Sequence, residues 1–314
     1  MLSPEGEPLT GAEVAILGTS YISLDQGRKF NSQSAREGQV VKADNQGRFQ
    51  LPPSLPNWVV AVHEQGFAKV HSDDLIKSPK VTLQPWGWIE GTLYFGSRPA
   101  PAEEIGLVPV ETGPNGLQYN FESSKATTDA MGSFIISNAP PGEARLALFA
   151  RINENSWMWS HLTPITVKAG EATKFKMGGS GRPVVGKARL SNPARAVIWG
   201  RGHNTLSTKW PQPPKPLRTD EEIRAWNRSP EYKSARANHR NYGVRFQTDG
   251  SFRIENVPAG SYDLRLDIRE PHADQPNRDV YIGGTTKEVI VPEIPGGMSE
   301  EPLELGEIEV PVRN

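Results

Sequence analysis

The sequence predicts an all-β protein of three tandem Ig-like or prealbumin-like β-sandwich modules, the third with a Pro-rich and short helical insertion. Two observations predict this class. Glycine and proline are frequent, with 30 and 28 copies in 314 residues, which favours many turns and short strands. Similar runs of alternating strands and turn residues also occur three times along the chain. Hydrophobic residues make up 36% of the chain, enough to fill cores.

The repeat consists of segments 42–67, 127–150 and 247–268. Each contains an Asp, a Gly two residues before a Phe, a short strand, a Pro-containing turn and a second strand. The residues of this turn signature are Asp44, Gly47, Phe49, Asp129, Gly132, Phe134, Asp249, Gly250 and Phe252. Asp can bond to its own backbone in a turn and Gly can take positive φ, so each signature predicts a tight hairpin before a strand. Calcium binding is disfavoured, because the alternating oxygen ligands and distal Glu are missing.

The third copy, "TDGSFRIENVPAGSYDLRLDI", shows the clearest alternation. We expect its apolar side chains to face a core and its charged ones to face water, as in a half-buried antiparallel strand. The predicted inward residues are Phe252, Ile254, Val257, Tyr262, Leu264, Leu266 and Ile268, and the predicted outward ones are Arg253, Glu255, Asp263, Arg265 and Asp267.

Three modules are predicted from the repeat, at residues 1–85, 86–178 and 179–314. The sequence "GGSG" at 178–181 is typical of a flexible joint. The third module is longer than the others because of an insertion at about 203–242.

The insertion begins with "WPQPPKP" (210–216), which predicts an extended polyproline-like segment. Residues 217–242 form the one helical-looking stretch, with Thr219 or Asp220 as its cap and Pro230 as an interruption. Its second half is basic, and a solvated helix face is the simpler explanation of that charge. A lid, a docking surface or plain packing would each account for the insertion.

Several function classes are disfavoured by composition and motifs. The chain has no cysteine, its six histidines lack metal-ligand spacing, and no nucleophile elbow or phosphate-binding loop occurs. We therefore predict no catalytic residue, cofactor or metal site, and no enzymatic activity. The net charge of −1 gives no reason to expect nucleic acid as a partner, and no apolar run is long enough for membrane insertion. The first residues do not resemble a secretory signal, so we expect a fragment of a longer chain.

Five tryptophans are the candidate contacts for a ligand or partner. Exposed aromatic side chains on a sandwich can stack on sugar rings or anchor a protein. The candidates are Trp157, Trp159, Trp199, Trp210 and Trp226. The competing interpretation is that they fill a core or the gaps between modules, since Trp is usually well buried.

The stretch "TDGSFRIENVPAGSYDL", its echoes at 44–60 and 129–146, and the pattern G-x-P-L-x-G-A-x-V at Gly6–Val14 resemble the carboxypeptidase regulatory-like family. These are transthyretin-like (prealbumin-like) β-sandwiches close to the Cna B-type and starch-binding-like folds. The third copy also resembles multi-module proteins of planctomycete-type bacteria. The resemblance implies small sandwich domains that carry no catalytic residues and no cofactor.

The predicted function is that of a non-catalytic structural or interaction protein. Its modules would act as a spacer or docking scaffold at the cell envelope or outside the cell, in an extracellular or periplasmic location. Expected partners are protein domains or polysaccharide, and the chain is expected to be a monomer or part of a larger chain. The alternative is a carbohydrate-binding protein that uses exposed tryptophans.

Overall fold

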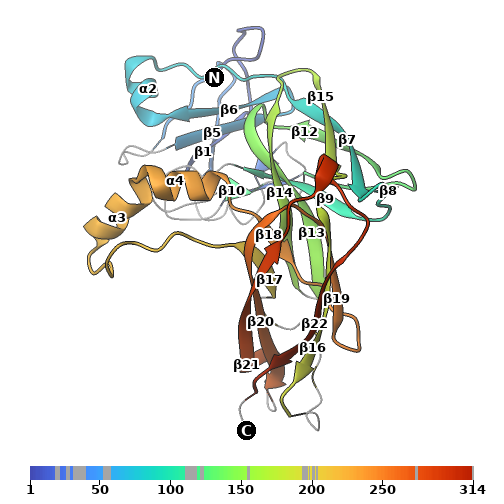
Figure 1. Ribbon diagram of the computed structural model, residues 1–314. Helices are drawn as coiled ribbons and strands as arrows, with labels where there is room; N and C mark the ends of the chain where they lie inside the picture. The colour runs from blue at the N-terminus through green and yellow to red at the C-terminus, as the bar shows by residue number, and fades with distance from the viewer. Residues whose placement is uncertain are drawn as a thin grey trace. The chain divides into compact units, whose positions relative to one another are not determined.

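The computed structural model confirms the all-β class, with strands in several sheets and few helices (Figure 1). The structure describes residues 1–17, 22–25, 29–30, 40–51, 58–109, 119–120, 124–153, 156–192, 197, 199, 202, 204–272 and 275–312. Within these residues, no helix has the length and apolar character needed to cross a membrane.

The chain forms two compact units. Unit 1 comprises Met1–Leu93, Pro101–Ala147 and Thr163–Met177, and unit 2 comprises Tyr94–Ala100, Leu148–Leu162 and Gly178–Asn314. Segments from the middle of the chain therefore contribute to both units. The predicted division at residues 85 and 178 stays a prediction.

Unit 1 contains a four-stranded sheet in the order β4-β1-β5-β6. Its strands are β4 (Val40–Lys42), β1 (Glu13–Leu17), β5 (Trp58–His63) and β6 (Gly66–His71), and β6 leads into α2 (Ser72–Lys77). All three pairings are antiparallel. One face packs on a core that includes Val14, Val59, Ala61, Val81 and Leu83, each at most 2% exposed.

Two further sheets involve strands that belong wholly or partly to unit 1. One has the order β11-β9-β13-β14, and the other has the order β12-β7-β15 with the short β8 paired to β7. Their strands are β7 (Gly87–Phe95), β8 (Arg98–Pro99), β9 (Glu104–Pro109), β11 (Lys125–Thr127), β12 (Ser133–Ala139), β13 (Gly142–Asn153), β14 (Ser156–Val167) and β15 (Ala172–Gly178). A small sheet joins β10 (Tyr119–Asn120), β2 (Ile22–Asp25) and β3 (Lys29–Phe30).

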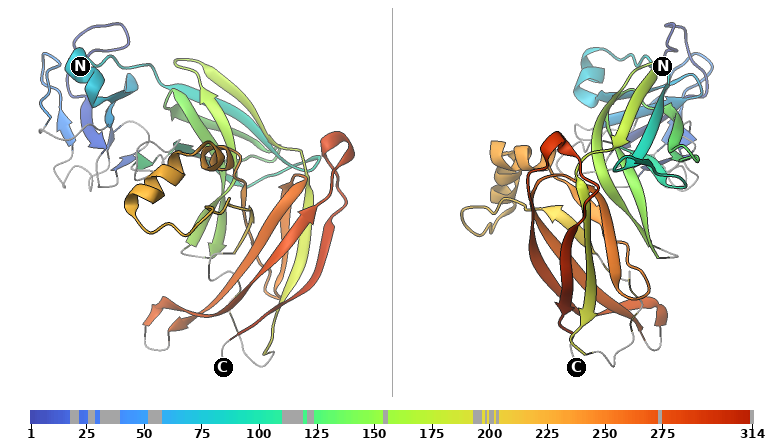
Figure 2. Two further views of the ribbon diagram at one scale, coloured as in Figure 1. Left: turned by 60° about the vertical axis from the view of Figure 1, so that its left-hand side comes forward. Right: turned by 45° about the vertical axis from the view of Figure 1, so that its right-hand side comes forward.

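Unit 2 contains a β-sandwich, whose strands run side by side in Figures 1 and 2. One sheet has the order β19-β16-β22 and the other has the order β18-β17-β20-β21. The strands are β16 (Arg182–Leu190), β17 (Thr205–Thr208), β18 (Asn241–Gly243), β19 (Ser251–Val257), β20 (Gly260–His272), β21 (Gln275–Val291) and β22 (Leu303–Val310), with the 3-10 turn η1 (Pro295–Gly297) before β22. The β16–β22 pairing is parallel.

The predicted inward residues of the third copy all lie in the unit 2 core. The side chains of Phe252, Ile254, Val257, Tyr262, Leu264, Leu266 and Ile268 are at most 3% exposed. The predicted outward position of Asp267 is wrong, because this residue is 6% exposed. Its carboxylate accepts two hydrogen bonds from the Arg265 guanidinium, and its N–H donates to Asn204 Oδ1. These bonds satisfy a charge that would otherwise be costly to bury.

The three turns have one backbone pattern. In the first two, Asp44 and Asp129 accept a hydrogen bond from the N–H three residues on, at 2.9 Å, and place their carboxylates on the N–H groups of the turn. The glycines that follow take φ of 72° in both turns. The turn prediction for Gly47 and Gly132 thus has a direct physical cause.

Asp249 occupies a different position from Asp44 and Asp129. In the third turn Gln247 makes the equivalent backbone bonds, to Gly250 and Ser251. Asp249 instead accepts hydrogen bonds from the hydroxyl and N–H of Ser251, and these together with Lys187 lower the pKa of its carboxyl. The expected strand at Phe49 is also absent, since Phe49 lies outside the strands and packs partly buried against the unit 1 core.

A glycine partner for the signature Phe recurs in two copies. Phe134 on β12 lies opposite Gly91 on β7, and Phe252 on β19 lies opposite Gly186 on β16. A Cβ atom on Gly91 would overlap the Phe134 ring, and one on Gly186 would lie 2.8 Å from Phe252 Cζ. Each ring therefore occupies space that only a glycine on the neighbouring strand leaves open.

The predicted flexible joint at 178–181 is held by backbone contacts. The N–H of Gly181 donates to Gly297 O at 2.7 Å, and its carbonyl accepts from the Ser299 N–H at 2.9 Å. Gly178 has φ of 75°, and a Cβ atom there would overlap Tyr94 O. Glycine is needed at these positions for close approach of the backbone, and a boundary between the two units falls at Gly178, so the predicted joint stays a prediction.

Candidate functional site: the insertion and a buried polar network

The insertion of the third module connects β17 to β18 and is closed at its base. Thr208 N–H donates to Arg240 O at 3.0 Å, and Arg240 N–H donates to Thr208 Oγ1 at 3.1 Å. These bonds extend the antiparallel β17–β18 ladder by one pair beyond Ser207 and Asn241. The residues between Thr208 and Arg240 are therefore an excursion from a complete hairpin.

Two helices form most of the insertion, α3 (Asp220–Arg228) and α4 (Pro230–Ala237). Thr219 is the N-cap of α3: its Oγ1 accepts the Glu222 N–H at 3.2 Å, and Glu222 Oε2 accepts the Thr219 N–H at 3.1 Å. This capping box decides between the two predicted caps. The Arg218 N–H, the Lys215 ammonium and the Thr219 N–H lower the pKa of Glu222 to about 2. Pro230 begins the second helix, which is the first-turn position that proline tolerates.

We expect Thr219→Ala to destabilise α3 by about 1 kcal/mol, since the Glu222 N–H loses its acceptor at a helix start. Hydrogen exchange should then speed up at the first-turn amides of α3, including Ile223. Amides of β20 such as Leu264 should keep their rates. Unchanged exchange in α3 would contradict the role of the capping box.

An aromatic cluster joins the two ends of the insertion. We use this name for Trp210, Trp226, Tyr232 and His239. The Trp210 ring stacks on His239 and on Tyr232, with centroids 4.4 and 5.5 Å apart, and Trp226 meets Tyr232 edge-on at 6.2 Å. Trp210 is 40% exposed, whereas the other three are half-buried. The structure thus brings two of the five candidate tryptophans together and leaves one of them open to solvent.

The other candidate tryptophans lie elsewhere. Trp159 packs on Phe149 with ring centroids 4.0 Å apart, and Trp199 packs on Phe246 at 5.3 Å against the unit 2 core. The side chain of Trp157 lies outside the described residues. Trp159 and Trp199 thus have the packing role of the competing interpretation.

Exposed basic side chains lie on both helices of the insertion. Arg224 and Arg228 lie one turn apart on α3, Lys233 lies on α4, and all three are exposed. Within the described part of the chain, no acidic side chain forms an ion pair with any of them. The carboxylate of the neighbouring Glu222 already accepts hydrogen bonds from the Thr219 N–H and the Lys215 ammonium.

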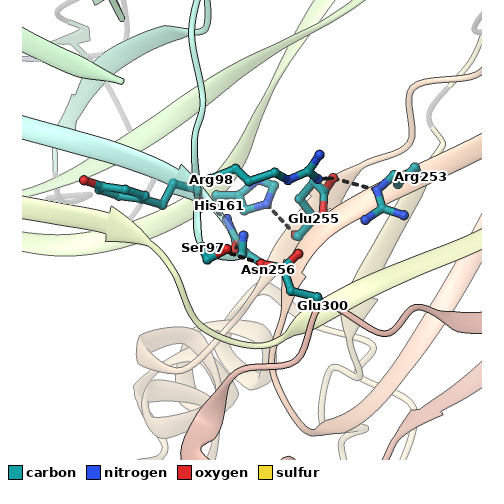
Figure 3. A network of polar contacts seen from close by, with 9 residues as sticks. Ser97, Arg98, His161, Arg253, Glu255, Asn256 and Glu300 are labelled. Carbon is teal, nitrogen blue, oxygen red and sulfur yellow. Dashed lines mark hydrogen bonds and ion pairs between the residues drawn. The ribbon is translucent and has the colours of Figure 1, made fainter. Parts of the chain in front are cut away.

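A buried polar network in unit 2 was not predicted (Figure 3). The His161 ring lies between two partners: Nε2 is 2.9 Å from Glu255 O, and Nδ1 is 2.7 Å from Ser160 Oγ. Ser160 Oγ also accepts the Gly243 N–H at 3.1 Å. The His161 ring also contacts the Tyr242 ring edge-on, with the two ring centroids 4.8 Å apart.

Burial lowers the pKa of His161 to about 4, and the nearby Arg245 charge acts in the same direction. The ring is therefore neutral at pH 7. A neutral ring has one donor, so Nε2–H donates to Glu255 O and Nδ1 accepts from the Ser160 hydroxyl. Every polar group of this arrangement is satisfied without a bound ligand.

Asn256 extends the network to the hairpin between β7 and β8. Its Nδ2 donates to Tyr94 O at 2.7 Å and its Oδ1 accepts the Gly96 N–H at 3.1 Å. Glu300 accepts the Ser97 N–H at 2.6 Å (Figure 3). His161 and Asn256 both have φ of 56°, a conformation that few residues other than glycine adopt.

One hollow lies beside the network in unit 2, and another lies on a sheet of unit 1. A cavity of about 60 Å³ lies beside His161, lined by residues that include Arg245, Arg253 and Glu255. A shallow depression of about 590 Å³ lies over the open face of the β12-β7-β15 sheet, with Glu90 and the 62% exposed Ile135 among its residues. The small cavity has room for about two waters, whereas small-molecule pockets occupy about 300–1,000 Å³. No group of three or more His, Asp or Glu side chains suited to a metal ion occurs among the described residues.

The site and fold define a class: an all-β protein with a helical, aromatic and basic insertion in one sandwich. The sequence matches no protein-family model and no curated protein. The resemblance to the carboxypeptidase regulatory-like family therefore stays a prediction.

Solved structures give low-scoring similarities. The minor pilin of Streptococcus agalactiae is 14% identical over 55% of this chain and 83% of the pilin, with a TM-score of 0.25. The major pilin subunit of Bacillus cereus is 17% identical over 54% of this chain and 59% of its own, with a TM-score of 0.22. A DUF3823 family protein from Bacteroides ovatus is 12% identical over 65% of this chain and 99% of its own, with a TM-score of 0.17. Scores of this size carry no functional meaning for this chain.

Proposed function

We propose that this chain is a non-catalytic scaffold of β-sandwich modules that docks a partner through its insertion, at the cell envelope or outside the cell. The observation that carries the proposal is that, within unit 2, the buried core lies in the sandwich and the exposed aromatic and basic side chains lie in the insertion. The sandwich core is complete without the insertion, because the Thr208–Arg240 pair closes the hairpin beneath it. The exposed Trp210 and the exposed basic side chains of α3 and α4 all lie beyond that pair.

Four titratable groups with shifted pKa values support a non-catalytic role. Asp44 and Asp249 hold turns, Glu222 caps a helix, and His161 is hydrogen-bonded on both ring nitrogens to structural partners. At catalytic sites a perturbed pKa serves proton transfer to a substrate, whereas these side chains form hydrogen bonds that hold turns, a helix cap and a backbone contact. Stoichiometric zinc in the purified protein would contradict this assignment.

Replacement of residues 209–239 by Asn-Gly tests the scaffold. Asn-Gly suits a two-residue hairpin turn between the paired Thr208 and Arg240. We expect the variant to unfold cooperatively within a few degrees of the parent temperature, measured by calorimetry, and to lose partner binding. A matched control keeps the insertion and replaces Trp210 with alanine. Unfolding of unit 2 in the loop-replacement variant would show that the insertion belongs to the core.

Carbohydrate binding is the second candidate function, and the exposure of Trp210 favours it. A solvent-facing indole ring held by stacking is suited to a sugar ring. Glycan-array binding should then be lost in Trp210→Ala and kept in Trp199→Phe, since Trp199 packs on the core. Equal binding by Trp210→Ala would exclude this tryptophan as the contact.

A further inference from the structure

Two adjacent residues of β14 connect this strand to β18 and β19. All the residues concerned belong to unit 2. The Gly243 N–H of β18 donates to Ser160 Oγ at 3.1 Å, and the His161 Nε2–H donates to Glu255 O of β19 at 2.9 Å. The Ser160 hydroxyl donates to His161 Nδ1, and the His161 ring meets the Tyr242 ring of β18 edge-on. The neutral ring is therefore the centre of a contact between three strands.

The groups on the β18 side of the ring do not compensate a positive charge. Arg245 follows β18, and the charge of its guanidinium disfavours a proton on the His161 ring. Tyr242 is neutral, since burial raises the pKa of its hydroxyl. The cavity of about 60 Å³ beside the ring has room for about two waters, too few to hydrate an imidazolium fully. Protonation of the ring in its packed position is therefore unfavourable.

The carboxylates on the β19 side are paired with arginines (Figure 3). Glu255 on β19 forms an ion pair with Arg253 at 2.6 Å and lies 4.0 Å from Arg98 on β8. Glu300 interacts electrostatically with the same two arginines. Two positive and two negative charges thus balance here. Glu255 presents its backbone carbonyl to His161, and this carbonyl accepts the Nε2 proton in the neutral and in the charged ring. The second ring nitrogen therefore decides what protonation does.

We propose that the His161 contact is an acid-sensitive switch, which keeps β14 packed on β18 and β19 at neutral pH and releases it in an acidic medium. A proton from solvent would enter at Nδ1, the nitrogen that accepts the Ser160 hydroxyl. The hydroxyl would then lose its acceptor on the ring, and a second positive charge would lie near Arg245. Release places the charged ring in water. The buried residues of the unit 2 core lie outside β14, so the sandwich can stay folded. This role is separate from docking through the insertion.

Amide hydrogen exchange of the full chain, followed by NMR at pH 7.5 and pH 5, tests the switch. The Gly243 amide is the direct reporter, because its N–H donates to Ser160. Its protection factor should fall by about 30-fold at pH 5, since the released ring has a pKa of 6.5 and the packed ring has a pKa of about 4. Low concentrations of urea should not accelerate this exchange, as expected for an opening that exposes little surface. The Leu264 amide of β20 should be more protected and should respond to urea.

A variant and its matched control assign the effect to one ring. His161→Asn should give nearly the same Gly243 protection at both pH values. The control His272→Asn removes a histidine at the end of β20 and should keep the 30-fold change. NMR titration of the His161 ring in the parent needs no variant. A ring that titrates near pH 6.5 while Gly243 stays protected would overturn the proposal. Gly243 exchange that is independent of pH, or that follows Leu264 at every urea concentration, would overturn it as well.

Discussion

Lowering the pH from 7 to 4 is expected to destabilise unit 2 by about 3 kcal/mol through His161 alone. In the folded state the pKa of His161 is lowered to about 4, whereas an unfolded histidine has a pKa of 6.5. The unfolded state therefore binds more protons between these values. The stability contributed by the neutral ring is complete above pH 6.5 and is lost as the pH falls from about 6.5 to about 4.

His161→Asn isolates this effect. Asn tolerates the positive φ of position 161 and does not titrate in this range. The variant should be less stable than the parent at pH 7, because the Glu255 carbonyl and Ser160 hydroxyl lose their ring partner. The unfolding free energy of the variant should change less between pH 6.5 and 4 than that of the parent. Parallel pH curves for parent and variant would show that another group controls acid unfolding.

Gly186→Ala is expected to destabilise unit 2 by about 1–3 kcal/mol, and Gly91→Ala is expected to do the same to unit 1. In each case the new Cβ meets a Phe ring that is 3% exposed and cannot move into solvent without exposing the core. Chemical denaturation of each variant gives the change in unfolding free energy.

A double variant distinguishes ring overlap from loss of backbone freedom. Phe252→Leu alone should destabilise the core, because it removes buried ring atoms. Combined with Gly186→Ala it should cost less than the sum of the two single changes, since the overlap is relieved. Strict additivity would contradict the proposed fit of the ring over the glycine.

Alternation and turn residues predicted the sandwich of unit 2 well. The inward positions of Phe252 to Ile268 follow from the two-residue period of a strand, which depends only on local geometry. Asp267 is buried although its position in the alternation predicts exposure, because Arg265 donates hydrogen bonds to its carboxylate and Asn204 accepts one from its N–H. The signature Phe was recognised, but its glycine partner was not, because strand register connects residues that are 43 to 66 positions apart.

The candidate site was predicted in part. The spacing of the repeats and the Pro-rich, helical-looking stretch located the insertion, and the structure brings Trp210 and Trp226 into one cluster. The polar network around His161 could not be anticipated, since its partner Glu255 lies 94 residues away and the contact is to a backbone carbonyl. A single histidine in an alternating strand gives no signal of such a contact. Positive φ at a non-glycine residue, which marks this site, is also invisible in the sequence.

The central claim is that binding resides in the insertion and that the sandwich only carries it. Hydrogen exchange measured by mass spectrometry, on the parent and on the 209–239 replacement variant, tests this most directly. We predict unchanged exchange in β19, β20 and the turn at 178–181 of the variant. Faster exchange throughout β19 and β20 in the variant would contradict the claim.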